Sequence, residues 1–184
     1  MIPPDVLTPL VLSAFTKEIT WLEASTRHPL DEVIETFFHT RGRTHGLLES
    51  LTDGQAAYSS PAHPLWSISE SVTHLIHTQN FYHNKLLDIS TSQLPHLVEA
   101  ARGFGEGARQ NVPVKDLRVS LNAATERIEV VFEQTRNSHD PEKTEKNPAF
   151  GICNYRTWTL LLLAHEMDHL RQIAAMRSLA RMNA

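Results

Sequence analysis

The chain has 184 residues, with a hydrophobic content of 41% and a charged content of 21%, which are ordinary values for one soluble globular domain with a substantial core. Its formal net charge is −4 and no two Lys or Arg residues are adjacent, which argues against a nucleic-acid-binding surface. No apolar run approaches the ~20 residues of a membrane span, and the single cysteine, Cys153, excludes an internal disulfide and a multi-cysteine zinc site.

The beginning of the chain predicts two helices. Met1–Asp5 lacks the basic region of a signal peptide, so we expect a cytoplasmic protein that does not associate with a membrane. Apolar residues at helical spacing predict a first helix over residues 5–26. A second helix is predicted over about 30–52, with acidic residues in its first turn and an apolar face. Residues 52–64 have the composition of a loop.

A third helix begins at a recognisable capping signal. Ser67 and Glu70 form an S-x-x-E capping box, and the predicted helix runs to about residue 89. It carries three histidines, His74, His77 and His83. Residues 91–112 contain three Gly and a Pro without periodicity, so we expect a long connection there.

Two more helices complete an all-α architecture. Apolar steps of three and four residues predict a helix over 114–136, which has the pattern of a bundle seam. A charged, Pro-containing loop is predicted over 138–148, and no β-pattern stands out. Asn154 is the predicted N-cap of a last helix that runs to Met182. The expected fold is a bundle of four helices plus an N-terminal extra helix.

The last helix carries two histidines that point the same way. Four residues advance an α-helix by ~400°, so His165 and His169 lie one turn apart with Cβ atoms ~6 Å from each other. That spacing suits two imidazoles that bind one cation, although packing histidines show it too. The letters also spell H-E-x-x-H, the zincin signature, but residues 170–184 contain no His, Asp, Glu or Cys to supply a downstream ligand. Any third ligand must therefore come from upstream.

Two segments resemble the DinB-like (YfiT-like) metalloprotein superfamily. One is Trp66-Ser-x-x-Glu70-x-x-x-His74, early in a helix; the other is Asn147-Pro-x-Phe-Gly151, followed by His165-x-x-x-His169-x-x-Gln172-Ile173. The resemblance covers about residues 30–180. It implies a DinB/YfiT-like four-helix bundle with a long connection between the second and third bundle helices. It also implies one divalent metal bound by His74, His165 and His169.

The resemblance also bears on the third ligand and on the domains. His77 lies about −60° around the helix from His74 and could compete for the metal. His74 is preferred, because it keeps the family's spacing from Trp66. Residues 1–28 are expected to be an accessory helix, and residues 29–184 the DinB-like metal-binding domain. An amphipathic accessory helix must cover apolar surface on its own bundle or on a second subunit, and we expect a homodimer because related bundles often pair.

Residues around the two histidines of the last helix are candidates for the rest of the site. Trp158 and Met176 fall on the same side of the helix, two turns to either side, and would wall a substrate-binding pocket, unless they are simply core. Gln172 is ~40° away and could donate to an imidazole or to a bound substrate. Glu166 and Asp168 lie ~80° away on opposite sides, so the helical wheel does not choose between them as the catalytic carboxylate. Glu166 is preferred for its longer reach.

Three neutral ligands leave a metal its full charge and open coordination positions, as in a catalytic site. Three imidazoles accept Zn, Ni, Fe or Mn. Some members of the family are transferases or isomerases that use bacillithiol, mycothiol or glutathione. The resemblance therefore implies a metal-dependent transferase with a low-molecular-weight thiol as co-substrate and a small-molecule electrophile. The alternatives are a metal-dependent hydrolase with Glu166 or Asp168 as base, and a non-catalytic metal-binding stress-response module.

Overall fold

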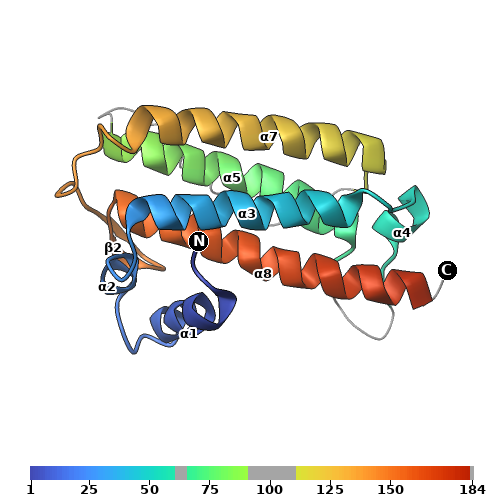
Figure 1. Cartoon of the computed structure of the whole chain (residues 1–184), viewed down its shortest axis with the longest axis horizontal. Helices are drawn as coiled ribbons and strands as arrows, with labels where there is room; N and C mark the ends of the chain where they lie inside the picture. Colours follow the sequence, from blue (N-terminus) through green and yellow to red (C-terminus); the bar gives the residue numbers. More distant parts are fainter. Residues whose placement is uncertain (61–65, 91–110, 183–184) are drawn as a thin grey trace.

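Four long helices form the body of the protein in a computed structural model that describes residues 1–60, 66–90 and 111–182. They are α3 (Leu30–Leu48), α5 (Ile68–Ser90), α7 (Val114–Thr135) and α8 (Tyr155–Met182). α8 packs against α3 and α5, and α7 packs mainly against α5 (Figure 1). The predicted all-α bundle is confirmed.

The bundle helices begin where local capping signals place them. Ser67 N donates to Glu70 Oε2 (2.8 Å) and Glu70 N donates to Ser67 Oγ (3.1 Å), so the predicted capping box of α5 is present. Asn154 Oδ1 accepts from Thr157 N (3.0 Å), which makes Asn154 the N-cap of α8 as predicted. These caps fix where each helix starts, and therefore how far along the bundle its histidines lie.

Short elements surround the bundle and differ from the sequence prediction. The first predicted helix is two helices, α1 (Pro4–Phe15) and α2 (Trp21–Ser25). α1 ends because Lys17 adopts a left-handed conformation (φ 63°) in which Lys17 N donates to Ala14 O and Glu18 N to Ser13 O. A lysine does this here, where a glycine would have been the recognisable signal.

Two other departures lie in predicted loops. α3 ends at Leu48, and α4 (Asp53–Ala57) follows with a capping box between Thr52 and Gln55. A small antiparallel hairpin, β1 (Glu145–Asn147) and β2 (Gly151–Cys153), pairs Lys146 with Ile152 just before α8. Strands of three residues carry too little periodicity to be predicted. The predicted long connection falls mostly on residues 91–110, outside the described ranges.

The core of the bundle is two apolar clusters separated by polar side chains. The first cluster includes Phe37, Phe132 and Trp158, and the second includes Leu48, Leu121 and Met176. Between them lies a set of mostly buried polar side chains that we call the polar layer: Arg41 and Thr44 on α3, His74, Thr78 and Gln79 on α5, Thr125 on α7, and His165, Glu166 and His169 on α8. Polar groups buried together at this depth need partners, so the polar layer is where chemistry is expected.

α1 covers part of its own bundle. Ile2 and Leu7 are buried in the first apolar cluster, and the Met1 amino group lies 3.0 Å from Glu35 Oε2. Arg171 Nη2 on α8 donates to Thr8 Oγ1 (2.6 Å). Across the described segments, no helix is both long and apolar enough to span a membrane.

Candidate metal centre

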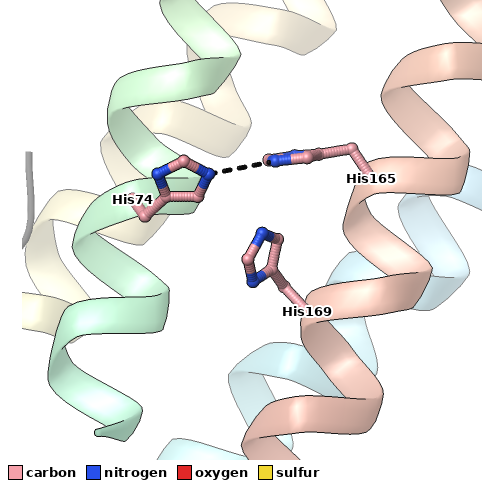
Figure 2. Close-up of side chains that lie close together, drawn as sticks. All are labelled: His74, His165 and His169. Carbon is pink, nitrogen blue, oxygen red and sulfur yellow. Dashed lines mark hydrogen bonds between the residues drawn. The ribbon is translucent and has the colours of Figure 1, made fainter. Parts of the chain in front are cut away.

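Three histidines converge in the polar layer. His74 projects from α5 toward His165 of α8, and His169 rises from the next turn of α8 toward the space between them (Figure 2). One nitrogen from each ring lies within 4.8 Å of the other two, and His74 Nε2 and His165 Nε2 share a hydrogen bond of 3.2 Å. Tetrahedral zinc with Zn–N bonds of ~2.0–2.1 Å places its ligand nitrogens ~3.4 Å apart. The three rings therefore reach one ion with small side-chain movements.

The protein favours the neutral, metal-binding form of two of these imidazoles, His165 and His169. Burial lowers the pKa of His165 well below its usual value, and the nearby His169, His74 and Arg41 lower it further when charged. Burial also lowers the pKa of His169, although the carboxylates of Asp168 and Glu166 oppose the shift. A neutral imidazole keeps a lone pair for coordination. Among the described residues, no hydrogen-bond partner meets the buried Nδ1 of His169.

Aromatic and hydroxyl neighbours fix the orientation of the rings. Trp66 stacks on His169, with centroids 5.7 Å apart and planes at 19°, and meets His74 edge-on at 4.8 Å. Thr78 Oγ1 lies 3.2 Å from His74 Nε2. Trp66 thus touches one histidine from each of the two helices, which gives a physical reason for its spacing from His74.

His74, and not His77, is the histidine of α5 that lies with His165 and His169. Over the part of the chain that the structure describes, only these three residues form a group of three or more His, Cys, Asp or Glu side chains able to hold one ion. His77, one turn further along α5, is not in it. His77 points about −60° away from His74 around the helix, as the helical geometry indicated.

A family model described as the DinB superfamily matches residues 36–173, about three quarters of the chain. The chain belongs to the DinB superfamily. The matched segment contains all three histidines and leaves out α1 and α2. None of the curated proteins and none of the solved structures compared with the chain matches it.

Glu166 is buried in this DinB-superfamily bundle, on the side of α8 that contacts α3. Both its oxygens are occupied: Arg41 Nε donates to Oε1 (2.9 Å), Arg41 Nη2 to Oε2 (2.8 Å), and Thr44 Oγ1 to Oε1 (2.7 Å). The side chains of Arg41 and Glu166 are 1% and 0% exposed. The carboxylate that the sequence favoured as the catalytic one is therefore committed to a buried ion pair with α3.

Asp168 is the more accessible of the two carboxylates. It is exposed, and its Oδ2 accepts from Gln172 Nε2 at 2.8 Å. Gln172, expected to donate to an imidazole or to a substrate, donates to Asp168 and also lies close enough to His169 for a side-chain hydrogen bond that raises the pKa of His169.

The other two expected pocket residues lie in the apolar core. Trp158 and Met176 are both fully buried, one in each apolar cluster. A cavity of about 550 Å³ does lie beside His165, but its walls are other residues, including Phe15 from α1, Phe150 and Tyr82. The aromatic ring of Tyr82 is 5.8 Å from that of His165. The sequence did not identify Tyr82 as a neighbour of the site, because a residue eight positions after His74 on a helix points ~80° away from it.

Proposed function

We propose that the chain binds one divalent metal ion through His74, His165 and His169 and is a metal-dependent small-thiol S-transferase. The observation that supports this most is the convergence of three histidine nitrogens in a buried polar layer, where burial favours the neutral form of His165 and His169. The proposed co-substrate is a thiol of the bacillithiol, mycothiol or glutathione type, which the family resemblance suggests. Zn, Ni, Fe and Mn all accept such ligands, so metal analysis must identify the ion.

The metal, when bound, would lower the pKa of a small thiol and so supply a thiolate at neutral pH. The chain's own residues have the tasks of positioning and of excluding water. Trp66 and Thr78 hold the imidazole rings. Burial raises the pKa of Tyr82, so its phenol stays protonated beside His165, where it can donate a hydrogen bond to a ligand.

The ion pair of Glu166 favours the transferase over the hydrolase. A hydrolase needs a carboxylate to guide water and carry a proton, an effect of roughly 10²–10⁴-fold. Glu166 is not available for this, because Arg41 and Thr44 occupy both of its oxygens. A thiol whose proton is already lost needs no such base. The hydrolase alternative then rests on Asp168 alone, and a binding module without turnover needs neither carboxylate.

The test begins with the purified protein loaded separately with each of the four metals. Its turnover is measured with bacillithiol, mycothiol and glutathione against 1-chloro-2,4-dinitrobenzene. In this reaction a C–S bond replaces the C–Cl bond, chloride leaves and the thiol proton goes to solvent. We expect thiol-dependent turnover that a chelator abolishes. Bound metal without thiol-dependent turnover would reject the transferase, and ester hydrolysis that collapses in Asp168→Asn would establish the hydrolase.

A further inference from the structure

A cavity beside the candidate metal centre has one wall made by α1. Val11, Leu12 and Phe15 line it from α1, and Tyr82, Phe150 and His165 line it from the bundle. Its volume is about 550 Å³, which is within the range of roughly 300–1,000 Å³ for small-molecule sites. Asp168 and Arg171 add the polar groups of α8. The cavity is thus mostly apolar and aromatic, with His165 of the metal-binding group in its lining.

The α1 wall leaves apolar side chains uncovered. Leu12 is 59% exposed and Phe15 is 58% exposed. The helix itself is held in place, because Arg171 Nη2 donates to Thr8 Oγ1 from α8 and Leu7 and Ala14 are buried. A fixed helix that presents uncovered apolar groups over a cavity is a surface that a ligand can cover.

α1 lies outside the segment that matches the DinB superfamily, which begins at residue 36. The wall it adds is therefore a feature of this chain rather than of the matched family segment. Residues that line a cavity near a reacting centre set which substrates fit there, and each methylene that fits or clashes changes the preference by about 10–200-fold.

We propose that this cavity binds the apolar, aromatic part of a small-molecule substrate, and that α1 determines which substrates are accepted. The reacting atom of the substrate lies at the His165 end. The nature of the reaction rests on the proposed function above, whereas binding of the apolar group does not. A second copy of the chain is the competing occupant. The small molecule is favoured because the cavity also contains the polar side chains of His165 and Asp168. A docked subunit would explain the uncovered Leu12 and Phe15, but not these polar groups.

The test uses N-phenyl-1-naphthylamine, a neutral aromatic probe whose fluorescence rises in apolar surroundings, with the full chain. Leu12→Asp places a charge in the cavity wall. Val6→Asp is the matched control, because Val6 is also an exposed apolar residue of α1 but does not line this cavity. We expect probe affinity to fall at least 10-fold in Leu12→Asp and to stay within twofold in Val6→Asp. Phe15→Ala removes an aromatic wall of the cavity without adding a charge and without touching the Thr8–Arg171 hydrogen bond, and it is also expected to weaken binding.

Circular dichroism and sedimentation velocity accompany each titration. Equal probe affinity in the folded wild type, Leu12→Asp and Phe15→Ala would overturn the proposal. So would a dimer that Leu12→Asp dissociates, because the cavity wall would then be a subunit interface. The probe needs neither metal nor turnover, so cavity binding without thiol transfer rejects only the proposed function. Thiol transfer whose KM for an aromatic electrophile is unchanged in Leu12→Asp rejects only the cavity.

Discussion

Arg41 of α3 and Glu166 of α8 form a bidentate ion pair, with Nε and Nη2 at 2.9 and 2.8 Å from the two carboxylate oxygens, and both side chains are buried. The pair spans the polar layer next to His165. It joins two bundle helices at the level where the metal ligands lie. It therefore fixes both the position of α8 and the orientation of α8 about its own axis.

Removing one partner of this pair should destabilise the protein strongly. Arg41→Ala leaves the Glu166 carboxylate buried without its cation, at a cost of about 3–5 kcal/mol. Urea unfolding of the wild type and the variant measures this difference. The double variant Arg41→Met with Glu166→Leu is expected to be more stable than Arg41→Ala, because it leaves no buried charge. A loss in Arg41→Ala below 1 kcal/mol would contradict the buried pair.

The three histidines should each be needed for metal. His74→Ala, His165→Ala and His169→Ala are each expected to abolish stoichiometric divalent metal, because two remaining imidazoles make an incomplete site. Elemental analysis of the folded variants is the measurement. His77→Ala is the matched control on α5, and the exposed His39→Ala is the control on α3. Metal loss in His77→Ala together with metal retention in His74→Ala would replace the proposed third ligand.

The metal-free protein should lose stability as the pH falls below about 7. The pKa values of His165, His169 and His45 are lowered in the folded state, with burial as the first cause in each. The unfolded chain, with histidine pKa near 6.5, then binds more protons than the folded chain, so the free energy of unfolding falls as pH falls through 6.5 toward the folded values. Well above pH 6.5 the histidines are neutral in both the folded and the unfolded chain, so they do not lower the free energy of unfolding there.

Urea midpoints at pH 8, 7, 6 and 5 in the presence of a chelator check this expectation. His45→Gln, which removes one titrating group at some distance from the metal ligands, should have a shallower pH dependence than the wild type. A free energy of unfolding that rises as the pH is lowered from 7 to 5 would contradict this expectation.

Cys153 should be unreactive in the folded protein. It is buried, and burial together with the charge of Glu145 raises its pKa to about 11. At pH 8 only ~10⁻³ of it would be thiolate, the form that reacts. Modification by 5,5′-dithiobis(2-nitrobenzoate) is therefore expected to be at least 100-fold slower than with free cysteine, and to become rapid in denaturant. Fast modification of the folded chain would make Cys153 a competitor for the thiol chemistry proposed here.

Asp168→Asn separates the two enzyme hypotheses. In a thiol transferase the variant should retain metal and lose less than ~10-fold in rate, because no carboxylate base is needed to form the thiolate. Arg177→Gln, further along α8, controls for a general effect of charge changes on that helix. A loss of 100-fold or more in thiol transfer with metal retained would give Asp168 a direct catalytic role.

Local sequence signals determined the helices and part of the metal centre. The Ser67–Glu70 capping box and the Asn154 N-cap act over three residues, so they can be recognised in the sequence without knowledge of the tertiary structure. The four-residue step from His165 to His169 likewise lies within one turn of one helix. His74 could be chosen as the third ligand only through the family resemblance, which supplied the expected spacing from Trp66.

Tertiary structure decided what the helical wheel left open, because periodicity fixes the angle between two side chains on a helix but not what lies opposite them. Glu166 and Asp168 sit at equal angles from the histidines, yet Arg41 on another helix occupies Glu166 and leaves Asp168 exposed. The cavity formed by α1, Phe150 and Tyr82 joins segments more than 60 residues apart, and no local spacing encodes such a meeting. The unpredicted end of α1 has the same origin: Lys17 takes a left-handed conformation that its own preference disfavours, and the packed helix on either side holds it there.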